Sequence, residues 1–185
     1  TTGRALLLML MHEYRRAILD PFVTLLEVHK LLYLLQEAGQ PLKLRFEKAP
    51  RGPYANNVRH VLNAVEGYYV SGYDGGADSP DKQLDVVPGA IEEAIAQLAE
   101  DRDSSKNLQR VVALVEGWET PHGLELLATV HWVVAQEGAR TLDEVLAKTY
   151  GWGDWKKRFS ERQIAIAYDN LTTSGWISPS TETKP

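Results

Sequence analysis

Apolar residues recur at intervals of three and four positions along most of this 185-residue chain. That spacing is typical of helices with one buried face. Leu7, Leu10 and Met11 form such a stripe near the start. The predicted helices cover residues 4–19, 21–38, 55–65, 89–100, 105–117, 121–137, 141–149 and 160–175. The sequence therefore predicts a mainly α fold.

Shorter stretches with strand character separate these helices. LKLRF at 42–46 alternates apolar and basic residues, YYVSGY at 68–73 is aromatic, and LDVV at 84–87 is rich in valine. Pro50 and Gly52 enforce a turn after the first stretch. We expect short β-hairpins and no extended sheet.

Two segments of the sequence resemble each other. HVLNAVEGYYVS at 60–71 and AYDNLTTSGWIS at 167–178 each read as an amphipathic helix that stops at glycine and passes into an aromatic strand. Three helices followed by a hairpin are typical of winged-helix modules. The prediction is one compact domain with tandem winged-helix-like elements. Its proposed bounds are residues 1–178 for the domain, about 21–76 and 120–178 for the winged-helix-like parts, and 179–185 for a flexible tail.

The charge and composition restrict the possible partners. With 25 acidic and 20 basic residues, the net charge is −5, which repels a phosphate backbone unless a local patch overrides it. No strong nucleic-acid binding is expected. The longest apolar run near the start, residues 5–11, is too short to span a bilayer, so no membrane partner is expected. The absence of cysteine fits a cytoplasmic location. The chain begins with Thr1, which suggests a piece of a longer protein.

Motifs for enzymatic chemistry are missing from the sequence. There is no GxSxG, GxGxxG or GxxxxGK[ST] string, and the absence of cysteine excludes thiolate nucleophiles and cysteine-ligated metals. His29, His60 and His131 share none of the short spacings of zinc motifs, although a metal site assembled from distant residues remains an alternative. The chain is expected not to be an enzyme, with no catalytic, cofactor-binding or metal-ligating residues.

The segment at 48–73, KAPRGPYANNVRHVLNAVEGYYVSGY, is the most site-like part of the sequence. Tyr54, Asn57, Arg59 and His60 can reach a ligand from the first turns of a helix, where free backbone amides also favour anions. The alternative is structural. In that case an asparagine caps the helix, Arg59 pairs with an acid, and the tyrosines pack.

A set of acidic residues follows this segment. Asp74, Asp78 and Asp81 lie in a polar loop and are either a solvated face or a surface that imitates phosphates to a basic partner.

Three segments, 25–46, 48–76 and 119–133, resemble the C-terminal region of the DarG antitoxins. GPYANNVRHVL and ETPHGLELLATVHW carry the resemblance. In that family an N-terminal macrodomain removes ADP-ribose from DNA, and the C-terminal part binds the DarT toxin, an ADP-ribosyltransferase acting on single-stranded DNA. The present chain shows no macrodomain pattern, so the resemblance implies a toxin-binding domain without hydrolase activity.

The resemblance also implies partners and a mode of action. The partners would be a DarT-like toxin and a covalently linked N-terminal macrodomain. Inhibition would come from occupying the toxin's single-stranded-DNA surface by mimicry. The predicted toxin-binding residues are Arg51, Tyr54, Asn57, Arg59, His60, Tyr69, Tyr73, Asp74, Asp78, Asp81 and Glu119. The alternative function, favoured by the winged-helix pattern and by Arg45, Lys48, Arg51 and Arg59, is a DNA-binding transcriptional regulator.

Overall fold

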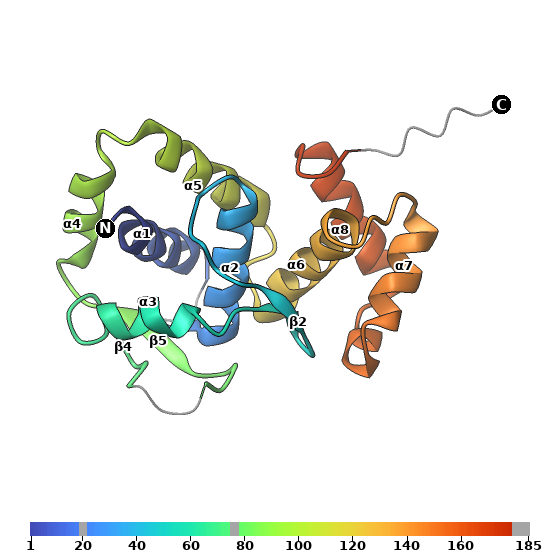
Figure 1. Ribbon diagram of the computed structural model, residues 1–185, viewed down its shortest axis with the longest axis horizontal. Helices are drawn as coiled ribbons and strands as arrows, with labels where there is room; N and C mark the ends of the chain where they lie inside the picture. The colour runs from blue at the N-terminus through green and yellow to red at the C-terminus, as the bar shows by residue number, and fades with distance from the viewer. Residues whose placement is uncertain (19–21, 75–77, 179–185) are drawn as a thin grey trace.

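A computed structural model describes residues 1–18, 22–74 and 78–178 of the chain (Figure 1). Its helices are α1 Thr2–Ala17, α2 Leu25–Glu37, α3 Val58–Val65, α4 Ala90–Leu98, α5 Arg102–Val115, α6 Pro121–Ala135, α7 Leu142–Gly151, the 3₁₀ helix η1 Asp154–Arg158 and α8 Glu161–Thr173. Its strands are β1 Val23–Thr24, β2 Glu47–Ala49, β3 Gly52–Tyr54, β4 Val70–Ser71 and β5 Gln83–Val86. The predicted mainly α single domain is confirmed.

The helix starts follow from capping side chains. Thr24 and Glu27 form a capping box at α2, so this helix begins at Leu25, and the predicted start at residues 20–21 lies outside the described residues. Ser160 and Gln163 form a second capping box at α8, as the sequence predicts. The Thr120 hydroxyl accepts a hydrogen bond from the Gly123 amide at 2.8 Å at the start of α6.

The strands are shorter than predicted and are set by tertiary contacts. LKLRF is not a strand: the Gln36 side chain binds both backbone groups of Leu44, Lys43 has a φ of 59°, and pairing starts only at Glu47. The β2–β3 hairpin is antiparallel, and a second small sheet has the order β1-β5-β4.

The hairpin predicted for the second winged-helix-like part is wrong. WIS at 176–178 forms no strand, because the Trp176 and Ile177 amides both donate to the Leu171 carbonyl and close the end of α8. Helices α6, α7 and α8 pack as a three-helix unit without a wing among the described residues. The predicted tail at 179–185 lies outside them.

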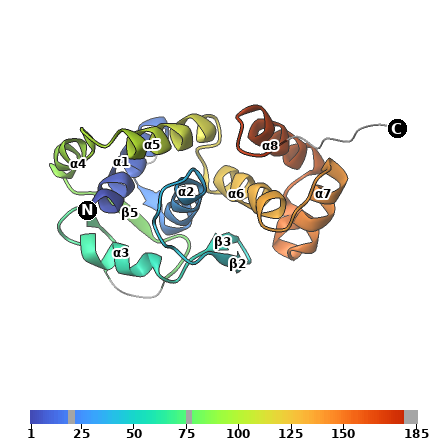
Figure 2. The same ribbon diagram turned by 45° about the horizontal axis from the view of Figure 1, so that its top comes forward.

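Helix α6 connects the two sides of the molecule (Figures 1 and 2). One side contains α1 to α5 and the small sheets, the other α7 and α8, and α6 lies between α2 and these last helices. Both α2 and α6 are buried around most of their circumference, and residues from both sides join one hydrophobic core. No helix of the described segments has both the length and the apolar character to cross a membrane.

Candidate functional site

A buried carboxylate on α6 gathers cations from two other parts of the chain. Glu125 is fully buried, and its Oε2 accepts from Lys156 Nζ at 3.2 Å and from Arg158 Nη2 at 2.7 Å. Its Oε1 accepts from Arg51 Nε and from Trp155 Nε1, both at 3.3 Å. We call these five residues the Glu125 cluster. Arg51 comes from the turn of the β2–β3 hairpin, and the other three partners come from η1.

The Glu125 cluster contains more positive than negative charge. One carboxylate faces three cationic side chains. Asp81 also reaches Arg51, at 3.4 Å, but its side chain is 84% exposed and its charge is screened by water. Burial lowers the pKa of Lys156 to about 8, although the Glu125 carboxylate opposes this shift. A further anion can therefore be accommodated here.

Lys30 on α2 lies next to this cluster. Its ammonium donates to the Pro53 carbonyl at 2.8 Å and is almost fully buried. Burial and the charge of Lys156 lower the pKa of Lys30 to about 7, against the attraction of Glu125. A Cβ at Gly52 would stand 3.0 Å from the Lys30 Cε, so the glycine leaves room for this side chain.

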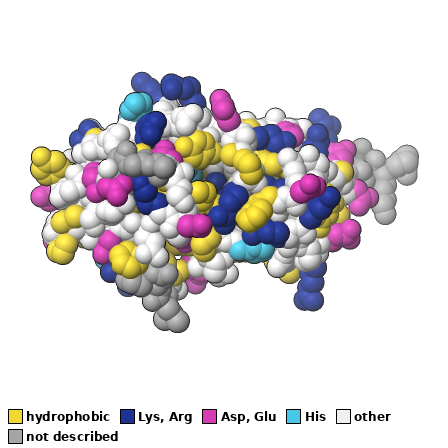
Figure 3. Space-filling model, turned by 90° about the horizontal axis from the view of Figure 1, so that it is seen from below, with side chains coloured by type: hydrophobic (Ala, Val, Ile, Leu, Met, Phe, Trp, Pro, Cys, Tyr) yellow, Lys and Arg dark blue, Asp and Glu magenta, His cyan; other side chains and the backbone are white. Residues whose placement is uncertain are grey.

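Trp155 presents its ring to solvent between two arginines. The residue is 44% exposed. The Arg158 guanidinium lies 4.2 Å and that of Arg51 5.2 Å from the ring. Figure 3 shows Lys and Arg side chains beside hydrophobic ones near the middle of the lower face of the molecule.

A small pocket opens on the other side of Arg51, between α2 and the hairpin. Its volume is about 220 Å³. The rings of His29 and Tyr54 stack there with centroids 4.4 Å apart. Burial, together with the charge of Lys30, lowers the pKa of His29 to about 3, so the imidazole is neutral and accepts from the Ala55 amide at 3.3 Å. We call this the His29–Tyr54 pocket. It is lined by Leu25, Leu26, His29, Lys30, Ala49, Pro50, Arg51, Gly52, Tyr54, Asp78 and Pro80.

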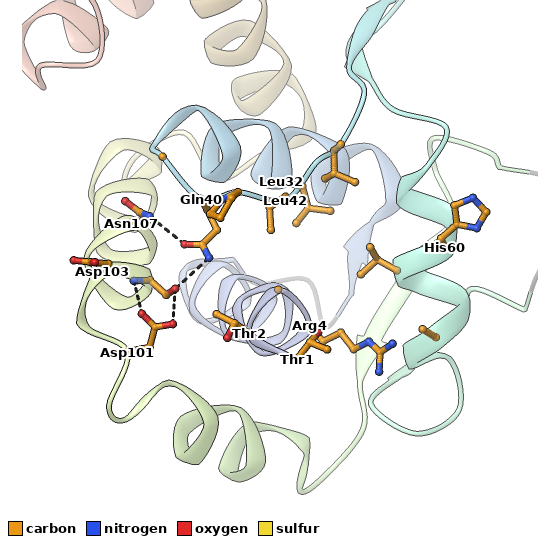
Figure 4. A pocket seen from close by; sticks show the side chains of 17 residues that line it. Thr1, Thr2, Arg4, Leu32, Gln40, Leu42, His60, Asp101, Asp103 and Asn107 are labelled. Carbon is orange, nitrogen blue, oxygen red and sulfur yellow. Dashed lines mark hydrogen bonds between the residues drawn. The ribbon is translucent and has the colours of Figure 1, made fainter.

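A larger hollow of about 820 Å³ lies between α1, α3 and α5 (Figure 4). Four of its polar side chains bind one another. Asn107 donates to Gln40, Gln40 donates to Ser104, and Ser104 donates to Asp101, over 3.0, 3.1 and 2.8 Å. This chain of hydrogen bonds ties α5 to the loop after α2, and it leaves the Glu125 cluster and its pocket as the better candidate site.

Six of the sequence-predicted residues come together beside the pocket. Asp78 accepts from the Tyr54 hydroxyl at 3.3 Å and the Tyr73 hydroxyl at 3.1 Å, and Arg59 approaches it at 4.0 Å. Arg51 and Asp81 form the ion pair described above. Tyr73, one of the predicted binding residues, is only 1% exposed, so its ring is not accessible to a partner in this structure.

The other predicted residues lie elsewhere. The Asn57 side chain bonds the backbone of Lys43 and Arg45 and makes no capping hydrogen bond to α3, so its contact is structural but is not the predicted cap. His60 is one of the residues that line the hollow of Figure 4, and Glu119 accepts from the Gly117 amide.

Two more of these residues form local pairs. Tyr69 has its pKa raised by a hydrogen bond to Glu93, and Asp74 pairs with Lys82. Lys82 also donates to the Tyr73 carbonyl at 2.7 Å, so the Asp74 pair lies beside the group around Asp78.

Sequence reasoning missed Glu125, Lys30, Lys156, Arg158 and Trp155. A signal was present for the first two, because each is a charged residue inside a helix that is otherwise apolar on nearly every side. Nothing local in the string WKKR shows that one of its lysines is buried. No three acidic or histidine side chains of the described residues come together as metal ligands.

The fold and site define a mainly α domain with a positively charged cluster around a buried carboxylate, next to a small pocket that contains the stacked rings of His29 and Tyr54. The chain is similar to a DNA ADP-ribosyl glycohydrolase of Thermus aquaticus, with 40% identity over 97% of this chain and 49% of the relative. Proteins of the same name from Mycobacterium bovis and Mycobacterium tuberculosis are 33% identical over 92% of this chain and 52% of theirs. The chain thus spans about half the length of the curated relatives it matches. No family model matches it.

These relatives correct the functional predictions. All three are named for a hydrolase activity and none as an antitoxin or a toxin inhibitor. The predictions of a toxin-binding domain, of inhibition by DNA mimicry and of a chain that is not an enzyme are therefore wrong. The names of these relatives also give no support to the alternative prediction, a DNA-binding transcriptional regulator. The predicted partners, a DarT-like toxin and a linked macrodomain, stay predictions.

Proposed function

We propose that this chain belongs to an enzyme that hydrolyses the bond between ADP-ribose and DNA, and that it acts in the cytoplasm. The observation that carries the proposal is the 40% identity to a DNA ADP-ribosyl glycohydrolase over 97% of the chain. Because the chain spans about half of that relative, the activity is proposed for the whole protein.

The Glu125 cluster supports this proposal through its charge. The ADP-ribose group on DNA carries a diphosphate, and arginine is the side chain best suited to binding phosphate oxygens in a fixed geometry. The net charge of −5 works against general nucleic-acid binding, but the local excess of cations reverses the sign at this site.

Within the site, Glu125 holds the cations in position. Its two oxygens already accept four hydrogen bonds from protein groups, and the side chain has no exposed surface. A carboxylate in that state stabilises an arrangement of charges rather than activating a water molecule. The contribution that this geometry supports is therefore the binding and orientation of the substrate.

The test is hydrolysis of an ADP-ribosylated oligonucleotide by two proteins, the 185-residue chain and a chain extended to the length of the relatives. Released ADP-ribose is separated and quantified by chromatography. We expect release by the extended protein. Release by the shorter chain would place the chemistry within these residues, and release by the extended protein alone would place it outside them. No release by either protein would contradict the proposal.

A further inference from the structure

We propose that the Glu125 cluster and the His29–Tyr54 pocket together form a binding site for a nucleoside diphosphate, with the base in the pocket and the phosphates against Arg51 and Arg158. This inference deepens the proposed function and rests on it for the choice of ADP-ribose as the ligand to test. Free nucleotides and the phosphates of DNA share the chemistry that the arginines recognise, so both are compared below.

The charge of the Glu125 cluster is the first argument. One buried carboxylate faces three cations, of which only Lys156 is fully buried, so an excess of positive charge is left at the edge of the cluster that a bound anion would offset. The side chains of Arg51 and Arg158 are 25% and 32% exposed, so both guanidinium groups remain reachable from solvent. Each guanidinium group donates to Glu125 from one of its nitrogens and has further N–H donors for a phosphate.

The pocket supplies the second argument. Sites for drug-sized ligands usually enclose about 300–1,000 Å³, so the His29–Tyr54 pocket, at about 220 Å³, suits a smaller group such as a single base. Five of its eleven lining residues are aliphatic, among them Leu25, Leu26 and Pro80. The neutral imidazole of His29 adds a ring without adding charge.

Arg51 joins the two parts. It lines the pocket, binds Glu125 at 3.3 Å, and lies 5.2 Å from the Trp155 ring. A ligand with its base in the pocket therefore has its phosphates beside Arg51, and Arg158, bound to the same carboxylate, stands next to it. A diphosphate has the two anionic groups that this pair of arginines matches.

The experiment is isothermal titration calorimetry of the 185-residue chain with four ligands: ADP-ribose, ADP, adenosine and inorganic phosphate. We expect ADP-ribose and ADP to bind with similar affinity. Adenosine and phosphate should each bind at least tenfold more weakly, because each engages only one half of the site. An unmodified single-stranded oligonucleotide is titrated as a fifth arm and should not compete with ADP-ribose.

Variants locate the site. Arg51→Gln and Arg158→Gln should each weaken ADP-ribose binding at least tenfold, whereas Arg162→Gln, at an exposed arginine of α8, should leave it unchanged. Thermal melting verifies that each variant folds. Should Arg51→Gln fail to fold, Arg51→Lys keeps the charge and loses the planar fork, and it should still weaken binding.

The inference is overturned if ADP-ribose does not bind, if adenosine binds as tightly as ADP, if the oligonucleotide displaces ADP-ribose, or if the folded arginine variants bind like the wild type. Its failure is distinguishable from that of the proposed function. Binding by this chain without hydrolysis by the extended protein would retain the site and reject the function, and hydrolysis without binding would do the reverse.

Discussion

Glu125 illustrates how a single buried charge holds distant segments together. Replacing it by Gln keeps the volume and removes the charge that Arg51, Lys156 and Arg158 share. Because buried cations are then left without their counterion, we expect Glu125→Gln to lower the free energy of unfolding by about 3–5 kcal/mol. Urea denaturation measures this loss. Glu100→Gln, at an exposed acid, should stay within about 0.5 kcal/mol of the wild type, and equal losses in both variants would refute the assignment.

His131 gives the protein a sensitivity to acid. It is buried beside Tyr33, whose hydroxyl shares a hydrogen bond with the imidazole Nδ1 over 2.8 Å, and burial lowers the pKa of His131 to about 4. Below the ordinary histidine pKa of 6.5, His131 is protonated in the unfolded chain but stays neutral in the folded chain. Stability therefore falls as pH drops from about 6.5 to 4. His29 acts in the same direction.

The test of this acid sensitivity compares His131→Asn with the wild type at pH 7 and at pH 4.5. The difference in urea midpoint between the two pH values should be smaller in the variant. An unchanged difference would show that His131 does not cause the effect.

At the scale of elements, the capping box of α8 is the clearest local signal. The Ser160 hydroxyl accepts from the Gln163 amide at 3.1 Å, and the Gln163 side chain accepts from the Ser160 amide at 3.0 Å. Ser160→Ala should cost about 1 kcal/mol, measured by thermal or urea unfolding. Thr173→Ala is the control, because its hydroxyl bonds only carbonyls of its own last turn. A cost for Thr173→Ala as large as that for Ser160→Ala would count against the cap.

The helices were predictable from sequence because their period and caps are local. The strands were not: LKLRF has an alternating pattern, yet the Gln36 side chain takes the hydrogen bonds of Leu44 that a partner strand would need. The candidate site was predictable only in part. Arg51 and Tyr54 lie in one conspicuous segment, but Glu125 and Arg158 come from 74 and 107 positions further along, and only the packing of α6 brings them to Arg51.

For the whole molecule, the packing of α2 against α6 joins the two sides into one unit. The hydrophobic core is continuous across this interface, and Lys48 pairs with Glu137 and Gln136 with Glu37 along its edge. We expect a single cooperative unfolding transition, because neither side can lose its structure without exposing the apolar surface of the other. Circular dichroism and tryptophan fluorescence should report coincident midpoints, and two separated midpoints would indicate independent sides.

The turn between α5 and α6 has a further consequence. Gly117 is exposed, has a φ of 87°, and has no atom within 4 Å of the position that a Cβ would occupy. The interface between α2, before this glycine, and α6, after it, is extensive. A backbone break at this point removes one covalent link and none of the contacts between Tyr33 and His131 or Arg51 and Glu125. Fragments 1–117 and 118–185, prepared separately, should reassemble on mixing into a one-to-one complex with native near-ultraviolet circular dichroism. The protein would then behave as a split reporter, in which recovered structure measures how strongly the two pieces recognise each other.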